Sequence, residues 1–220
     1  MKIIIAVTFF GILAFAFAEY PTEDTEECLN LQDYEGFNST KFLKGTWYVT
    51  HARYGSNYTV CREYKTRLRK NGSINLVADG YYNYRGEPKY FRVRCEGTKD
   101  KSGKNENGKF SLKCKQQPRG RGNKIVIDFQ LELTVVKTDY CKFAVLYRCA
   151  TFLPENGQPK IEDNLLILHR EKDVLDPRVQ KVLELYESSL EKFLSRKDDE
   201  CLPSPVQNKK KKNSKEKMAE

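Results

Sequence analysis

Short hydrophobic runs that alternate with polar residues fill most of the chain between residues 46 and 170. The runs are rich in Val, Ile, Tyr and Phe, which favour strands, and they end at clusters of Asn, Gly, Asp and Pro. Turn residues such as Asn71-Gly72 separate consecutive runs and suit tight hairpins. The pattern predicts eight strands, at residues 46–54, 58–68, 73–84, 89–96, 108–115, 123–136, 140–151 and 162–170.

The short connections between these strands predict an all-β fold, an eight-stranded up-and-down antiparallel barrel. Hairpin turns join each strand to the next, so consecutive strands pair antiparallel. Closing the sheet removes its exposed edges, which an open sheet of this kind would leave in solvent. The interior of an eight-stranded barrel is wide enough for one small ligand.

A different periodicity follows residue 170 and predicts one amphipathic α-helix packed outside the barrel. Asp176 suits the N-cap, and Pro177 suits the first helical position. Packing on the barrel explains the apolar stripe more simply than contact with a membrane or a cofactor. The stripe recurs at steps of three and four residues and consists of Val179, Val182, Leu183, Tyr186, Leu190, Phe193 and Leu194.

The two ends of the chain do not have the composition of a folded domain. Residues 1–18 combine an early Lys, an apolar stretch too short to span a bilayer and an Ala-Phe-Ala pattern, and we interpret them as a secretory signal peptide. Residues 19–27 contain five acids and predict a flexible leader. The predicted domain covers residues 28–202, and residues 203–220 form a disordered, Lys-rich tail.

The formal net charge is +9, and the tail supplies a large part of it. This tail either is simply solvated or adheres to anionic cell surfaces. A second basic cluster is Arg67-Leu68-Arg69-Lys70. No nucleic-acid recognition motif accompanies it, and a secreted basic protein more often meets heparan sulfate or anionic lipid. We therefore expect no nucleic-acid partner.

Secretion favours disulfide bonds among the seven cysteines. They are evenly spread and include no CxxC pair, so no zinc site is predicted. Sequons at Asn38, Asn57 and Asn71 are candidate glycosylation sites. The cysteines are Cys28, Cys61, Cys95, Cys114, Cys141, Cys149 and Cys201.

Three short motifs carry a family resemblance. Gly45-Thr46-Trp47 begins the first predicted strand, Thr138-Asp139-Tyr140 begins the seventh, and Arg170 ends the eighth. Together they resemble the three signature regions of lipocalins. In this interpretation Trp47 closes one end of the barrel and the Arg170 guanidinium stacks on its indole. The motif residues Gly45, Trp47, Thr138, Asp139, Tyr140 and Arg170 are then structural.

The resemblance narrows to the triabin group of salivary lipocalins from blood-feeding triatomine bugs. It rests on FLKGTWYVTH at residues 42–51, VCREYKT at 60–66, and residues 138–140 leading to Cys149. The group includes a thrombin inhibitor and pallidipin-like platelet inhibitors, and it is related to nitrophorins and to salivary binders of amines, nucleotides and eicosanoids. The resemblance implies the disulfide pairs Cys28–Cys149, Cys61–Cys201 and Cys95–Cys114. Cys141 is then either a free thiol or a point of intermolecular pairing.

The sequence argues against catalysis and against haem binding. His51 and His169 are the only imidazoles, and no hydrolase, zinc-protease or phosphate-loop motif accompanies them. We expect no enzyme activity, metal site or cofactor. Haem binding of the nitrophorin kind needs a histidine on the strand that contains residues 81–84, and the resemblance places Asn83 at that position.

Alternation along the strands indicates which side chains face the barrel interior. If Trp47 points inward, Val49 and His51 share its face. The same reasoning groups Tyr81 with Asn83, and Arg148 with Leu146. Core or rim packing is the more frequent role of a tyrosine in a strand. The candidates for ligand contacts are Val49, His51, Tyr81, Asn83 and Arg148.

Two functions of different classes fit these features. The first is sequestration of a small host mediator, namely ADP, an eicosanoid or a biogenic amine, which would inhibit platelet aggregation or vasoconstriction. The positive balance of the domain favours an anionic ligand. The alternative is inhibition of thrombin through the protein surface, and the basic exosite of thrombin would require an acidic face, which residues 19–27 offer. In either case we expect a monomer.

Overall fold

The computed structural model describes residues 24–32, 34–84, 86–98, 107–119, 126–153 and 157–205. The predicted signal peptide and the lysines of the predicted tail lie outside these residues. Among the helices in the described part of the chain, none is both long and apolar enough to cross a membrane.

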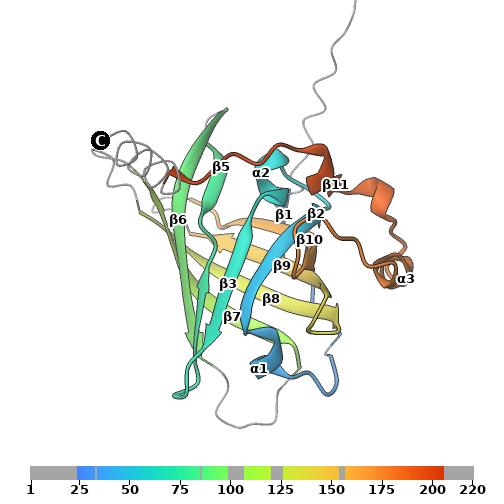
Figure 1. Ribbon diagram of the computed structural model, residues 1–220. Coiled ribbons are helices and arrows are strands. Elements are labelled where there is room, and N and C mark those ends of the chain that lie inside the picture. The colour runs from blue at the N-terminus through green and yellow to red at the C-terminus, as the bar shows by residue number, and fades with distance from the viewer. Residues whose placement is uncertain are drawn as a thin grey trace, which may run out of the picture.

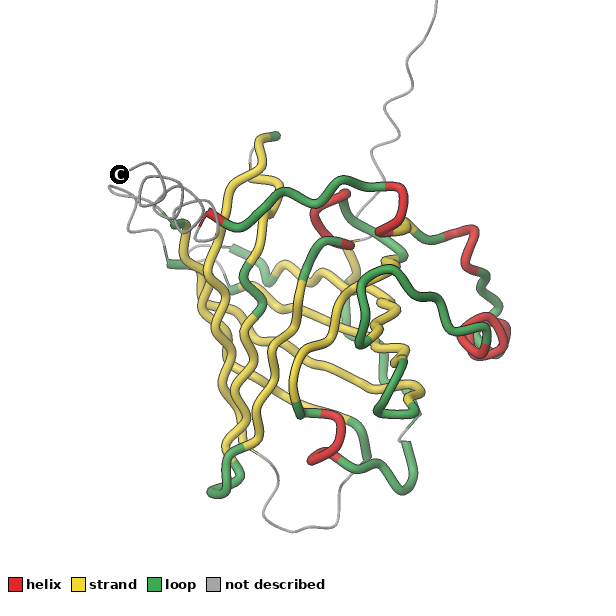
Figure 2. The backbone as a smooth tube through the Cα atoms, in the orientation of Figure 1, coloured by secondary structure: helices red, strands yellow, loops and turns green. Residues whose placement is uncertain are grey.

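The described chain forms a closed, eight-stranded antiparallel barrel (Figures 1 and 2). Pairing of β10 with β2 closes it. Strands β4 and β5 both pair with β6, so they share one position in the barrel. The strands of the barrel are β2 (Gly45–Ala52), β3 (Glu63–Leu68), β4 (Ser73–Val77), β5 (Gly80–Tyr84), β6 (Glu87–Thr98), β7 (Lys109–Pro118), β8 (Ile127–Thr138), β9 (Phe143–Phe152) and β10 (Lys160–His169).

Short elements lie at the two ends and along the outside of the barrel. Helix α1 precedes β2 at one end, and α2 lies near the other end (Figure 1). Helix α3 lies outside the barrel wall (Figure 1). These elements are β1 (Asp24–Thr25), α1 (Ser39–Phe42), α2 (Asn57–Val60), α3 (Arg178–Glu184), the 3-10 turns η1 (Leu190–Lys192) and η2 (Arg196–Asp198), and β11 (Leu194–Ser195).

The buried hydrophobic residues form two clusters, one on each side of the barrel wall. The larger cluster fills the interior and includes Trp47, Phe91 and Leu146, each at most 2% exposed. The smaller one joins Val179 and Leu183 of α3 to residues of β9 and β10. The structure therefore confirms that the C-terminal helix packs on the outside of the barrel.

This helix is shorter than the sequence predicts. It begins at Arg178 with Pro177 as the N-cap, one residue later than predicted, and the carboxylate of the preceding Asp176 accepts the backbone N–H of Arg178 at 3.0 Å. The helix ends at Glu184, however, and Tyr186 is 42% exposed rather than packed on the barrel. Leu194–Ser195 instead pairs with β2 as strand β11. An open edge of β2 provides main-chain partners here that a continued helix could not use.

Two of the predicted strands also differ locally from the observed ones. The run at residues 58–68 begins with the helical turn α2, because Ser56 and Thr59 form a reciprocal capping box at its start. The run at residues 73–84 is interrupted before Gly80, where the Asp79 carboxylate accepts the backbone N–H of Val93 on β6 at 3.0 Å. Side-chain acceptors thus replace ladder bonds at both interruptions.

Part of the predicted flexible leader is a strand. Asp24 and Thr25 pair with Glu162 and Ile161 of β10, although residues 19–27 carry the composition of a disordered segment. Strand β2 pairs with β10 only from Leu166 onward, so this stretch of β10 has an open edge. Strand β1 covers that edge, which explains why an acidic segment is ordered here.

A β-bulge in β2 decides where His51 points. The register pairs Val49 with Leu168 and His51 with Ile167, so Thr50 is an extra residue in β2. Beyond the bulge the alternation is reversed, and Ala52 rather than His51 joins the interior cluster. Because Ile167 belongs to the outer cluster, His51 lies on the outside of the wall. The prediction that His51 faces the interior is wrong for this reason.

His169 is buried in the same outer region, and we expect it to make stability depend on pH. Its Nε2 accepts the backbone N–H of Asp176 at 3.1 Å, and its Nδ1 lies 2.7 Å from Thr50 Oγ1. Burial, assisted by the nearby His51, lowers the pKa of His169 to about 4. In the unfolded chain the ring takes up a proton near pH 6.5. The native state therefore gains stability above pH 6.5 and loses it as the pH falls toward 4.

We expect this loss to reach about 2–3 kcal/mol by pH 4. Urea unfolding of the wild type and of His169→Gln at pH 7, 5.5 and 4.5 measures it. The variant should be less stable than the wild type at pH 7. The difference between their free energies of unfolding should become smaller as the pH falls. A difference that is the same at every pH contradicts the assignment.

Candidate ligand-binding cavity

A cavity of about 320 Å³ lies inside the barrel, bordered by residues from β3 through β10. Its volume is within the range of small-molecule sites, about 300–1,000 Å³. Much of the wall is apolar or aromatic, formed by side chains such as Leu76, Val93, Phe129, Leu131 and Phe152. Such a wall suits a ligand with a substantial hydrocarbon part.

The end of the barrel at α1 is closed by Trp47. The indole is 1% exposed, and its Nε1 donates to the backbone oxygen of Phe42 at 2.9 Å. The Arg170 guanidinium carbon lies 3.5 Å from the ring centroid, and its Nη1 donates to the carbonyls of Lys44 at 2.8 Å and Thr46 at 3.0 Å. The guanidinium thus stacks on the indole as expected, and these contacts are consistent with a structural role for both residues.

The second signature motif forms a turn rather than the start of a strand. Thr138 ends β8, and Phe143 begins β9. The Asp139 carboxylate accepts the backbone N–H groups of Lys142 at 2.8 Å and Phe143 at 3.1 Å. Tyr140 adopts a positive φ of 66°, and its hydroxyl accepts the N–H of Asn38 at 2.9 Å. The motif thus fixes this turn and holds the segment before α1 against it.

Two arginines give the cavity its charge. Arg62 precedes β3, and Arg148 alternates on β9 with Leu146 and Ala150, which belong to the interior cluster. The Arg62 guanidinium carbon lies 4.1 Å from the ring centroid of Tyr82 on β5. The Nε of Arg62 is buried without a hydrogen-bond partner in the described structure. An unsatisfied buried donor costs about 1–3 kcal/mol, so this N–H favours a ligand that carries an acceptor.

Tyr82 supports this arrangement as a neutral phenol. Its hydroxyl donates to the backbone oxygen of Ala78 at 2.9 Å. Burial raises the pKa of Tyr82, while the positive charges of Arg62 and Arg148 act in the opposite direction. The ring can therefore orient the Arg62 guanidinium through a cation–π contact without neutralising its charge.

The remaining charges of the lining are Lys160 and Glu162. They form an ion pair in which Lys160 Nζ lies 3.0 Å from a Glu162 carboxylate oxygen. Because the charges of this pair cancel each other, Arg62 and Arg148 leave the described part of the lining with an excess of two positive charges. The electrostatics of the cavity therefore favour an anion over a cation.

Of the five predicted contact residues, Arg148 and Asn83 border the cavity and three do not. Val49 faces the interior but is fully buried in the core. His51 lies outside the wall because of the bulge at Thr50. Tyr81 makes an edge-on contact with Tyr90, and its hydroxyl lies 3.4 Å from the backbone oxygen of Pro203.

The interior tyrosines of β5 are Tyr82 and Tyr84 rather than Tyr81. Ile74, Leu76 and Ala78 are all buried, so the even-numbered side chains of residues 73–84 face the barrel interior. Extending that alternation across the interruption at Asp79 identifies the two tyrosines of β5 that border the cavity, which Tyr64 of β3 also borders. The sequence therefore contained the signal for them. Arg62 carried a similar signal, because in the predicted strand at residues 58–68 it alternates in phase with the buried residues Tyr64 and Thr66, although the structure places it between α2 and β3.

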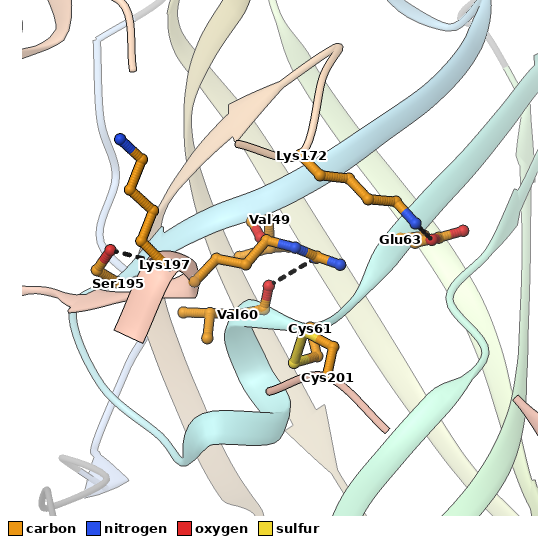
Figure 3. The surroundings of a disulfide bond; sticks show 9 residues. Val49, Val60, Cys61, Glu63, Lys172, Ser195, Lys197 and Cys201 are labelled. Carbon is orange, nitrogen blue, oxygen red and sulfur yellow. Dashed lines mark hydrogen bonds and ion pairs between the residues drawn. A yellow bond between two sulfur atoms is a disulfide. The ribbon is translucent and has the colours of Figure 1, made fainter. Parts of the chain in front are cut away.

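Three disulfides brace the barrel, and they are the pairs that the family resemblance implies. Cys28–Cys149 and Cys61–Cys201 tie the two terminal segments to the barrel, and Cys95–Cys114 joins neighbouring strands β6 and β7. Figure 3 shows Cys61–Cys201 beside Val60. Cys141 is an exposed free thiol in the turn after Asp139.

The three sequons lie in different settings. Asn57 and Asn71 are exposed, at α2 and in the hairpin between β3 and β4. Asn38 is only partly exposed, and its side-chain oxygen caps α1 by accepting the N–H of Lys41 at 2.9 Å. Glycosylation of these residues stays a prediction.

We expect haemin not to bind with axial ligation, because neither His51 nor His169 borders the cavity. Haem carriers of this kind need an imidazole on the iron, and the amide of Asn83 is a poor substitute. Absorbance titration with haemin measures this, with Asn83→His as a comparison that introduces the missing ligand. A saturable Soret shift at one equivalent of haemin with the wild type would contradict the expectation.

Comparison with known proteins agrees with this architecture. A model of the family described as Triabin matches residues 17–182. The chain belongs to the Triabin family. Members of this family are binding proteins, not enzymes. Triafestin-2 of Triatoma infestans is 45% identical to the chain, over 95% of it and 99% of the relative. Pallidipin of Meccus pallidipennis is 36% identical, over 91% and 98% of the respective chains.

Solved structures extend the comparison to ligand complexes. A mutant of LTBP1 in complex with leukotriene C4 has a TM-score of 0.51 and 26% identity, and the alignment covers 78% of this chain and 92% of that one. The tryptamine complex of an amine-binding protein of Rhodnius prolixus has a TM-score of 0.61 at 18% identity, with 83% and 93% covered. The second likeness shows the lipocalin-like fold alone. Both proteins share the barrel of this Triabin-family chain.

Proposed function

We propose that this Triabin-family protein is a secreted salivary lipocalin that sequesters a small amphipathic anion of the host, of the eicosanoid type. The observation that supports this most strongly is the pair of interior arginines, Arg62 and Arg148, in a cavity with largely apolar walls. In this proposal the hydrocarbon part of the ligand lies against Leu131 and Phe152, and its carboxylate faces the two guanidinium groups.

The energetics favour an anion at this position. A charge-assisted hydrogen bond contributes about 1.5–3 kcal/mol, and the buried Nε–H of Arg62 would gain the acceptor that it lacks. A biogenic amine would place its ammonium near these two positive charges. Its nearest opposite charge in the lining is Glu162, which Lys160 already neutralises. The leukotriene complex of LTBP1, at 26% identity, is consistent with this ligand class.

Sequestration would act by mass action and without a chemical step. A bound mediator is removed from solution, so inhibition of platelet aggregation or vasoconstriction should be stoichiometric and surmountable by more agonist. This behaviour separates a scavenger from a catalyst, which would consume excess agonist with time. It also separates it from a thrombin inhibitor, which would prolong clotting and spare aggregation triggered by other agonists.

Calorimetric titration of the purified protein with leukotriene C4, a thromboxane analogue, ADP and serotonin tests the proposal. A thrombin clotting assay is run alongside. We expect one equivalent of an eicosanoid to bind, with serotonin at least about tenfold weaker because of the charge of the cavity. If serotonin binds most tightly, the anionic ligand is wrong. If thrombin is inhibited and no small ligand releases or absorbs heat, the sequestration proposal is wrong.

A further inference from the structure

The outer face of the barrel holds a second concave site, separated from the ligand cavity by the sheet. It is an open groove of about 1080 Å³ across β4, β6, β7 and β8. Four exposed cations and two acids line it. We call this surface the outer groove and define its charged residues as Arg69, Arg94, Lys113, Lys115, Glu96 and Asp128.

The sheet register concentrates the positive charges of the outer groove. Arg94 on β6 lies directly opposite Lys115 on β7, and Lys113 is two residues farther along the same strand. Neighbouring strands are about 4.8 Å apart, so these cations form a compact row. Arg67 on β3 lies opposite Asn75 of the groove and extends the basic surface toward Arg69.

Some of these charges are available to a partner. Arg94 pairs with Asp79, and Lys115 Nζ lies 3.6 Å from a carboxylate oxygen of Asp128. In the described structure Arg69 and Lys113 have no carboxylate within ion-pair distance. The net charge of the lining is positive, so its electrostatic complement is a partner with repeated negative charges.

The uncharged lining indicates what kind of polyanion fits. Hydroxyl and amide groups of Ser73, Asn75, Ser111 and Gln130 line the groove between the cations. The side-chain oxygen of Asn75 is buried and lacks a donor, while its Nδ2 lies 3.4 Å from Glu96. A donor from a sugar, a hydroxyl or a sulfated amine, would satisfy this oxygen.

We propose that the outer groove binds a sulfated polysaccharide of the glycosaminoglycan class. Its sulfates would contact Arg69, Lys113 and Lys115, and its hydroxyl groups would contact the amides and serines between them. Among the described residues, the lining contains no aromatic side chain on which a base could stack, which disfavours single-stranded nucleic acid. These residues also present no exposed apolar side chain for insertion into a lipid surface. Such binding would retain the secreted protein at cell surfaces, independently of the ligand in the barrel.

Heparin-affinity chromatography of the full secreted chain tests this proposal. The groove variant is Arg69→Ser/Lys113→Ser/Lys115→Ser. A control of equal charge is Lys181→Ser/Lys192→Ser/Lys197→Ser, whose sites are exposed on the C-terminal segment. A third protein lacks residues 209–220 and so removes the basic tail. Circular dichroism and leukotriene C4 titration establish that each variant is folded and show whether the barrel site is intact.

We expect the groove variant to elute at lower salt, with about tenfold weaker heparin affinity, since three exposed ion pairs between the protein and heparin sulfates are lost. The charge-matched control and the tail-deleted protein should each shift less. Equal shifts of the groove and control variants would show charge attraction without a site and overturn the proposal. Loss of heparin binding on tail deletion alone, or binding to phosphatidylserine vesicles but not to heparin, would overturn it as well. None of these outcomes depends on whether an eicosanoid binds in the barrel.

Discussion

Replacing Trp47 with alanine should destabilise the protein by about 3–5 kcal/mol, the usual cost of removing a large buried aromatic side chain. The substitution removes the plug at the closed end of the barrel, where the indole is 1% exposed. It also removes the surface on which the Arg170 guanidinium stacks at 3.5 Å. Urea unfolding at neutral pH measures the difference in free energy of unfolding.

Trp47→Phe is the matched comparison, because it keeps an aromatic ring and loses the Nε1–H that donates to Phe42. We expect it to cost about 1–3 kcal/mol, between the wild type and the alanine variant. If Trp47→Ala unfolds within about 1 kcal/mol of the wild type, the indole does not close the barrel as the structure indicates.

The second large effect is expected from the Cys61→Ser/Cys201→Ser variant. This disulfide closes a loop over a sequence separation of 140 residues, and the chain-entropy model assigns such a closure about 3–5 kcal/mol. The C-terminal segment crosses α2 near the open end of the barrel (Figure 1). It is otherwise held by β11 and by Arg196, whose Nη1 donates to the backbone oxygen of Val60 at 2.9 Å.

Thermal melting and hydrogen exchange together measure this loss. The variant should have a lower melting temperature, and amides of residues 194–205 should exchange faster than those of β8 and β9. Cys141→Ser is the control, because Cys141 is an exposed free thiol. Its melting temperature should equal that of the wild type. Unchanged protection of residues 194–205 in the double variant would show that β11 and Arg196 hold the segment without the disulfide.

The number and order of the barrel strands could be predicted from the sequence because each strand has an alternating pattern and a turn at its end. The three disulfides followed from the family resemblance, since seven cysteines alone allow many pairings. The closed end was predictable as well, because Trp47 and Arg170 occur in motifs with a fixed place in the barrel.

What could not be predicted depends on local backbone irregularity. A single extra residue at Thr50 reverses the face of His51, and the hydrophobic pattern of β2 carries no mark of it. The end of α3 at Glu184 depends on a free edge of β2, a tertiary feature that helical periodicity does not contain. Arg62 lies between α2 and β3, in a stretch where a helical turn interrupts the predicted strand at residues 58–68.

The most direct test of the central claim is the affinity of leukotriene C4 for the wild type and for Arg148→Met, measured by calorimetry. Arg148 borders the cavity, so loss of its charge should weaken binding about tenfold or more, in line with one charge-assisted hydrogen bond. Arg92→Met removes an equally positive, exposed side chain from β6 outside the cavity lining and should bind as the wild type does. Equal affinity of all three proteins would contradict the claim that the interior arginines bind the anion.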